Sequence, residues 1–255
     1  MPRLDDKVVL ITGTGGGQGR EAALQFTAAG ARVVGCDIRA DTSEETLALV
    51  RAAGGDFVSM HPVDLRDPAA VERWIDDCIA LHGRIDVLYN NASAPRHAPV
   101  GSFPLDDWHF TIDSELHSVF YVTRFAWPHL VASRGVVINI ASTAGIRGST
   151  PGGLAHATAK AGVIGMTKHL ALEGAPHGIR VLSISPGGIE TPAIAAYGKA
   201  HPEDLKAAVA KNLIPRLGQP AEIVRMALFL ASDDAAYMTG ENVVIDGGRT
   251  TCTHW

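Results

Sequence analysis

The chain has 255 residues, of which 46% are hydrophobic and 19% are charged, and its formal net charge at pH 7 is −5. This length and apolar content are enough for one large core, so we expect residues 1–255 to form a single domain. Acidic and basic residues are interspersed, so the chain lacks the basic runs that are typical of proteins that bind nucleic acid or an anionic membrane surface.

The amino terminus and the cysteines indicate the cellular compartment. Residues 1–7 contain no apolar signal region, and no uninterrupted apolar segment is long enough to span a bilayer. Cys36, Cys78 and Cys252 are an odd number of cysteines at unrelated spacings, which suggests neither a disulfide framework nor a zinc site. We therefore expect a cytoplasmic protein that binds no metal ion, no membrane and no nucleic acid.

The first predicted unit consists of a strand, a glycine-rich loop, a helix and a second strand. The apolar run 8–11 predicts a buried strand, residues 12–19 read TGTGGGQG, and residues 21–29 predict a helix. Glycines permit a sharp turn and the close approach of a pyrophosphate, to which the start of the helix offers free N–H groups. The second strand, predicted over 32–37, ends in Asp37, whose carboxylate is placed to accept hydrogen bonds from an adenosine ribose.

The rest of the chain alternates between strand and helix patterns, which predicts an α/β fold. We expect a single-domain, doubly wound parallel sheet of the Rossmann type, with helices on both faces and ligands bound beyond the carboxyl ends of the strands. Residues 189–217 are predicted to be a less regular segment and the substrate lid, because they are Ala-rich and broken by three prolines. Further strands are predicted over 56–60, 84–89, 135–140, 179–184 and 242–246, and further helices over 44–53, 68–81, 105–131, 154–173 and 221–231.

Several short motifs follow the glycine loop in a fixed order. Asp64 follows the third strand, NNA stands at 90–92, PGGIET at 186–191, and RLGQP at 216–220. Together with the glycine loop they resemble the pattern of the short-chain dehydrogenase/reductase family over nearly the whole chain. The resemblance implies a nicotinamide cofactor, a small-molecule substrate, and a homotetramer or dimer with the helices at 105–131 and 154–173 in an interface. It implies cofactor contacts by Gly13, Gly15, Gly17, Gln18, Gly19, Asp37, Ile38, Asp64, Leu65, Asn91, Ala92, Lys160, Pro186, Gly187, Ile189 and Thr191.

The catalytic positions depart from the pattern that the family shows. Where the family has Tyr-x-x-x-Lys, this chain has His156 and Lys160, and Glu115 stands at the position of the family's catalytic asparagine. The catalytic serine corresponds best to Ser142, and Thr143 is the other candidate for the same hydroxyl.

The glycine loop matches the family's pattern, but the motif after the fourth strand departs from it at one residue. The glycine that closes the family's Asn-Asn-Ala-Gly motif is replaced here by Ser93. His97, Tyr197 and His201 are further candidates for the pocket lining, with positions on the outer surface as the alternative.

An imidazole is able to do the work of the missing phenol. In the family, the serine polarises the substrate oxygen, the tyrosine exchanges its proton, and the lysine tunes the tyrosine and binds the nicotinamide ribose. Imidazole also acts as an acid or base near neutral pH. His156 and Lys160 share one helix face, so the Lys160 cation disfavours a protonated His156, whereas Glu115 favours it.

Three hypotheses about function stay open at this point. The chain is an NAD-dependent oxidoreductase that uses Ser142, His156, Lys160 and Glu115 to interconvert an alcohol and a ketone or aldehyde. Alternatively it retains NAD for aldol-type cleavage, dehydration or decarboxylation, or it binds the cofactor with little activity. Asp37 favours NAD over NADP because its carboxylate repels a 2′-phosphate. A metal site formed by Glu115, His156 and His117 lacks a compact ligand motif.

Overall fold

Short apolar runs form the centre of the molecule, because each is buried on both sides and pairs with its neighbours through the backbone. The computed structural model describes residues 3–148 and 151–251. All seven strands described there are parallel and form one sheet in the order β3-β2-β1-β4-β5-β6-β7. Their bounds are β1 Val8–Thr12, β2 Arg32–Cys36, β3 Phe57–Met60, β4 Val87–Asn90, β5 Val136–Ile140, β6 Arg180–Pro186 and β7 Asn242–Ile245.

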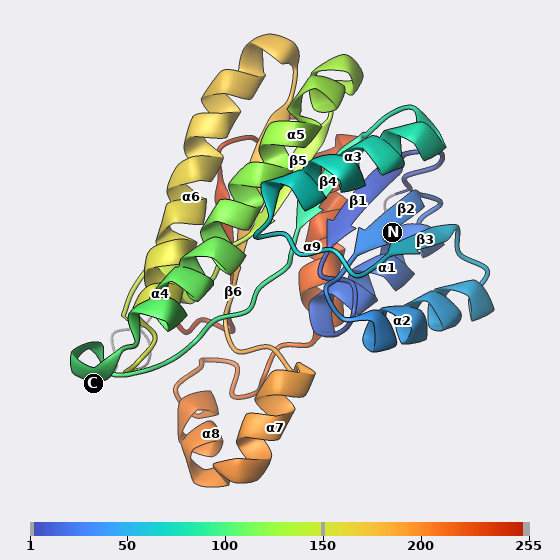
Figure 1. Ribbon diagram of the computed structural model, residues 1–255. Helices are drawn as coiled ribbons and strands as arrows, with labels where there is room; N and C mark the ends of the chain where they lie inside the picture. Colours follow the sequence, from blue (N-terminus) through green and yellow to red (C-terminus); the bar gives the residue numbers. More distant parts are fainter. Residues whose placement is uncertain (1–2, 149–150, 252–255) are drawn as a thin grey trace.

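Helices cover both faces of this sheet, which confirms the predicted fold class (Figure 1). Alternate strand residues point to opposite faces. Val9 and Ile11 of β1 pack in one buried cluster with α1 and α9, while Val8 and Leu10 pack in another with α3 and α5. The α-helices are α1 Gly17–Ala28, α2 Ala40–Ala52, α3 Pro68–His82, α4 Leu105–Ile112, α5 Ser118–Ser133, α6 Leu154–Gly174, α7 Pro192–Ala200, α8 Pro202–Val209 and α9 Pro220–Ala231.

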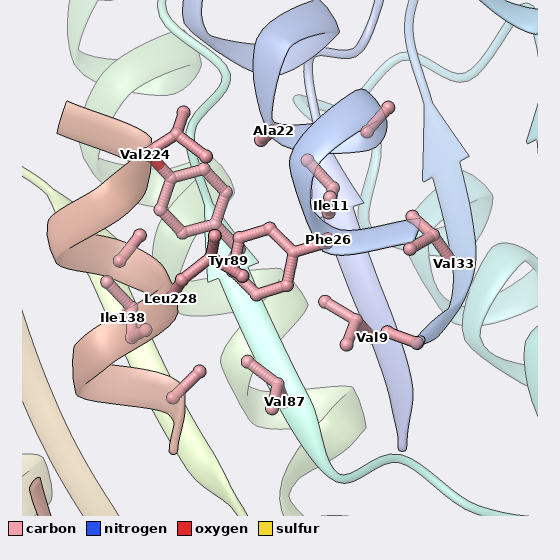
Figure 2. Packing of buried hydrophobic residues seen from close by; sticks show 14 of the residues in the cluster. Val9, Ile11, Ala22, Phe26, Val33, Val87, Tyr89, Ile138, Val224 and Leu228 are labelled. Carbon is pink, nitrogen blue, oxygen red and sulfur yellow. The ribbon is translucent and has the colours of Figure 1, made fainter. Parts of the chain in front are cut away.

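One aromatic pair anchors the core beneath the glycine loop. The rings of Phe26 in α1 and Tyr89 in β4 lie 5.8 Å apart, and Val224 and Leu228 of α9 belong to the same cluster (Figure 2). The Tyr89 hydroxyl is buried and has no hydrogen-bond partner among the described residues. Burial raises the pKa of Tyr89 far above its usual range, so this phenol is a packing group and not a proton exchanger.

The prediction of one continuous helix over 105–131 is wrong in the middle of that range. The structure has α4, then a π-helical turn over Asp113–His117, then α5. The apolar period is that of a regular helix on both sides of the turn, and the single wide turn shifts its phase without ending the pattern, so the sequence indicates one helix. The turn nevertheless decides the direction in which Glu115 points.

The predicted lid segment is more regular than expected, since it contains α7 and α8. Pro192 and Pro202 stand in the first turns of these helices, where a missing N–H costs no hydrogen bond. Thr191 caps α7 by accepting a hydrogen bond from the Ile194 N–H at 3.4 Å. Because the sequence analysis interpreted these prolines as helix breakers, it missed the starts of α7 and α8. Smaller differences are that α2 begins at Ala40, four residues earlier than predicted, and β4 at Val87, three residues later.

Two predictions concern cysteines and membranes. Cys36 and Cys78 are buried free thiols, and Cys252 lies outside the described residues. Within residues 3–148 and 151–251, no helix combines the length and the apolarity needed to cross a membrane.

A buried amide network ties the two central strands to the helices behind the site. Asn90 at the end of β4 donates to the Asn139 side-chain oxygen at 2.9 Å and to the Thr123 hydroxyl at 3.2 Å. Asn139 in turn donates to the Thr167 hydroxyl of α6 at 2.9 Å. All four residues are buried, so each hydrogen bond replaces water that is absent there.

We expect Asn139→Ala to lower the free energy of unfolding by roughly 2 to 4 kcal/mol, because it leaves buried partners unpaired and opens a small cavity. Urea unfolding followed by circular dichroism measures this change. Asn212→Ala is the control, since its amide bonds the Arg216 carbonyl at the surface. Equal stability of the two variants would contradict a structural role for the network.

Candidate active site

The glycine loop after β1 is held against the end of β4. The Asn91 side chain donates to the Thr12 carbonyl at 3.0 Å and to the Gly13 carbonyl at 3.3 Å, and the Thr12 hydroxyl accepts the Asn91 N–H at 2.9 Å. A Cβ added at Gly19 would lie 1.9 Å from the Gly13 oxygen, so the first turn of α1 can carry no side chain there. The loop backbone is therefore fixed before any ligand arrives.

Asp37 lies at the far end of this loop with its carboxylate already oriented. One oxygen accepts the Gly15 N–H at 2.8 Å and the other accepts the Arg39 N–H at 2.9 Å. The Arg39 guanidinium is mostly exposed, with its Nε 4.0 Å from the carboxylate. Each carboxylate oxygen keeps a further lone pair, so the group can still accept hydrogen bonds from a diol.

Asp64 has a partner that the sequence analysis did not anticipate. Arg66 holds both carboxylate oxygens, with its Nε 2.9 Å and its Nη2 2.6 Å from them. These hydrogen bonds lower the pKa of Asp64. Leu65, between the two, is buried, whereas Ile38 beside Asp37 is 52% exposed. Asp64 thus fixes a turn at the predicted adenine end of the cleft.

The loop after β6 lies beside the glycine loop. Thr191 lies beside Gly17 of the glycine loop, and Ile189 is buried beneath it. Pro186 ends β6, whose carboxyl end lies at the same edge of the sheet as that of β1. The structure therefore brings the predicted cofactor residues at 12–19, 91–92 and 186–191 to one edge of the sheet.

These residues fit a dinucleotide. The side-chain oxygen of Gln18, at the start of α1, is buried and has no partner among the described residues. Together with the free N–H groups of that helix start, it suits a phosphate-bearing ligand with hydrogen-bond donors of its own. Asp37 would hold the ribose of such a ligand.

The catalytic candidates centre on a buried carboxylate. Glu115 is fully buried, and its Oε2 lies 2.7 Å from Nδ1 of His156 in the first turns of α6. Its Oε1 accepts a hydrogen bond from the Ser93 hydroxyl. Burial alone would raise the pKa of Glu115, but the Lys160 charge and the bonds from His156 and Ser93 lower it, so the carboxylate is ionised near neutral pH.

Lys160 supplies the positive charge near the Glu115 carboxylate. It is 2% exposed, and its Nζ donates to the Ile140 carbonyl at the end of β5 at 3.0 Å. Burial lowers the pKa of Lys160, and the nearby Glu115 carboxylate partly offsets that effect. The Lys160 amine is therefore held by the Ile140 carbonyl, and its charge interacts with that of Glu115.

Ser142 is oriented by its own turn. Its Oγ accepts the Ala144 N–H at 3.1 Å, which leaves the hydroxyl proton free to be donated to a substrate. Thr143 begins the short turn that follows, and both residues are half-buried.

Two histidines near these residues differ in their surroundings. The His97 ring centroid lies 6.2 Å from that of His156, and burial, with a further contribution from His156, lowers the pKa of His97. His117 points elsewhere and lies 2.7 Å from Asp113. Across residues 3–148 and 151–251, no group of three or more His, Cys, Asp or Glu side chains is arranged to hold a metal ion.

The role of Ser93 is the main feature that sequence reasoning missed. Ser93 was recognised only as a departure from glycine. A signal existed, because glycine is lost at 93 in the same chain in which a carboxylate stands at 115. Their contact joins residues 22 positions apart, which no local pattern reports.

Comparison with known proteins agrees with this geometry. Residues 13–250 match the family model described as enoyl-(acyl carrier protein) reductase. The chain is 38% identical to the 3-oxoacyl-(acyl-carrier-protein) reductase of Thermotoga maritima, covering 96% of this chain and 98% of that protein. It is 34% identical to the meso-2,3-butanediol dehydrogenase of Serratia marcescens, over 97% of this chain and 96% of that protein.

A solved structure extends the comparison to three dimensions. A single-residue variant of actinorhodin polyketide ketoreductase with NADPH superposes with a TM-score of 0.92 at 29% identity, over 99% of this chain and all of that one. The sheet and helices described above are therefore shared with a solved structure that contains NADPH.

Proposed function

The chain belongs to the short-chain dehydrogenase/reductase family, and from that premise we propose that it is an NAD(H)-dependent oxidoreductase with His156 as its proton-transfer residue. It interconverts an alcohol and a ketone or aldehyde, the reaction class to which the names of its relatives belong. The observation that carries this proposal is the 2.7 Å contact of His156 with the buried Glu115, because it gives the imidazole a fixed orientation at the position of the family's tyrosine.

The proposed reaction assigns one task to each side chain. In the oxidation, Nε2 of His156 takes the proton of the substrate hydroxyl while the C–H bond breaks and its electron pair leaves as hydride. A nicotinamide held by the glycine loop and by residues 186–191 would supply the hydride acceptor, and the C–O bond becomes a carbonyl. The Ser142 hydroxyl donates to the substrate oxygen in both directions, and Glu115 stabilises the imidazolium that forms. In the reduction, the imidazolium returns the proton to that oxygen.

Lys160 has a changed task in this proposal. With no phenol to tune, its charge keeps Glu115 ionised, and its position at the end of β5 suits a contact with the nicotinamide ribose. The segment 189–217, with α7 and α8, covers the substrate as a lid. Of the further candidates, His97 lies near His156, with ring centroids 6.2 Å apart, whereas Tyr197 and His201 lie against each other in exposed positions of the lid segment, with ring centroids 4.8 Å apart.

The second hypothesis, a reaction without net redox change, uses the same residues. A carboxylate–imidazole pair can also remove a proton from carbon. Product formation with no change in the absorbance of the reduced cofactor would favour it over hydride transfer.

We expect NAD to bind at least about tenfold more tightly than NADP, a difference of about 1.4 kcal/mol. The reason is that a 2′-phosphate would place negative charge against the oriented carboxylate of Asp37. Isothermal titration calorimetry with both cofactors measures the ratio. Asp37→Ser should reduce the preference, and Arg39→Ala should increase it, because the Arg39 guanidinium lies 4.0 Å from that carboxylate and would attract a phosphate there. Equal or tighter binding of NADP by the unchanged protein would reject the assignment.

We expect His156→Phe to reduce turnover by roughly 10²- to 10⁴-fold with cofactor affinity kept, because the substrate proton then has no acceptor. Steady-state kinetics with a panel of ketones and aldehydes measures this loss. His177→Phe, at an exposed histidine beyond α6, is the matched control. Full turnover by His156→Phe would remove this residue from the mechanism.

We further propose that the protein works as a homotetramer or dimer in the cytoplasm. Phe120 of α5 is 49% exposed and Leu172 of α6 is 72% exposed, on the helices predicted to form an interface. The free thiols of Cys36 and Cys78 suit a reducing compartment. Sedimentation equilibrium at micromolar concentration should give a mass of two or four chains, and a monomer would contradict the interface.

A further inference from the structure

We propose that Ser93 is a positioning residue, and that Ser93, Glu115 and His156 form one hydrogen-bonded triad that holds the imidazole proton on Nδ1 and leaves Nε2 free for the substrate. The inference rests on the proposed function, because that function gives His156 its proton-transfer role. Ser93 itself contacts neither substrate nor cofactor in this role, since it acts through Glu115.

The two oxygens of Glu115 are each engaged by a different donor. Oε1 accepts the Ser93 hydroxyl and Oε2 lies 2.7 Å from Nδ1 of His156. An ionised carboxylate only accepts hydrogen bonds, so a neutral imidazole must carry its proton on Nδ1 to make this contact. The lone pair is then on Nε2, the nitrogen that points away from Glu115. This is the tautomer that a general base for a substrate hydroxyl requires.

The π-helical turn explains how a carboxylate reaches this point. Glu115 is fully buried, whereas its neighbours Ser114 and Leu116 in the turn are half-buried. One extra residue in a turn rotates everything beyond it by about 100° relative to a regular helix. The turn thus presents Glu115 to α6 and to the loop after β4 at the same time.

The hydrogen bond from Ser93 matters because the Glu115 carboxylate that accepts it is fully buried. A buried carboxylate oxygen without a donor is strongly disfavoured, and no water is needed at Oε1 while the serine hydroxyl fills that place. Ser93 itself is an exposed residue. Its replacement by alanine therefore removes a hydrogen bond without opening a cavity, and the protein should fold.

The other titratable groups facing His156 do not provide this orientation. His97, in the loop after β4, lies 6.2 Å away between ring centroids and is not bonded to Nδ1. Lys160, on the same helix as His156, acts on the pair through the charge of Glu115. Orientation of the imidazole therefore depends on Glu115, and that of Glu115 on Ser93.

Nitrogen NMR tests the triad directly. Long-range ¹H–¹⁵N correlations of the cofactor-free protein report the tautomer of each imidazole, and comparison with His156→Phe assigns the signals of His156. We expect a single Nδ1–H tautomer in the unchanged protein and in Ser93→Thr, which keeps the hydroxyl. Ser93→Ala and Glu115→Ala should show a mixture of tautomers. Ser102→Ala, at an exposed serine whose hydroxyl bonds only the Pro99 carbonyl, is the matched control and should show no change.

Kinetics gives the second measurement. Ser93→Ala should lower kcat by about tenfold with little change in KM, the loss expected for one hydrogen bond to a charged group, and Ser93→Thr should restore most of it. An unchanged tautomer together with unchanged kcat in Ser93→Ala would overturn the triad while leaving His156 as the proton-transfer residue. Full turnover by His156→Phe would instead overturn the proposed function, and the NMR result would still decide whether the triad exists.

Discussion

The site depends on one buried charge, the carboxylate of Glu115. An ionised carboxylate that is fully shielded from water is tolerated only when hydrogen-bond donors and a nearby cation replace its hydration. Ser93 and His156 supply the donors and Lys160 supplies the cation, so three separate parts of the chain must meet at one point. The same requirement orients the imidazole, because its Nδ1 is held at Glu115 and its other nitrogen lies on the opposite side of the ring.

The architecture around this charge explains why these segments can meet. In a parallel sheet, the carboxyl ends of neighbouring strands lie at one edge, so the loops after β4 and β5 emerge side by side. The buried bonds from Asn90 to Asn139 and from Asn139 to Thr167 fix those strand ends to α6, the helix that carries both His156 and Lys160. A rigid frame of this kind holds a 2.7 Å contact between residues 41 positions apart.

The glycine loop and the proposed catalytic position differ in how freely their residues can be substituted. At the glycine loop the constraint is steric, since a single Cβ at Gly19 would overlap the Gly13 carbonyl oxygen. At the proposed catalytic position the constraint is chemical, since that role needs a side chain that exchanges a proton near neutral pH and is held in place. On the proposed function, this difference would account for a chain that keeps the glycine loop while His156 does the work of the family's tyrosine.

The amino-acid sequence by itself determined the fold class, the order of strands and helices, and the motifs that lie at the carboxyl edge of the sheet. These follow from local patterns, such as apolar runs, glycine spacing and helix periodicity, which need no knowledge of distant contacts. Only the tertiary structure decided that the helix around Glu115 contains a π-helical turn, that Arg66 holds Asp64, and that Ser93 bonds Glu115. A π-helical turn shifts the phase of the apolar pattern without ending it, and a hydrogen bond between Ser93 and Glu115 exists only once β4, α5 and α6 have packed, so the sequence alone placed neither of them.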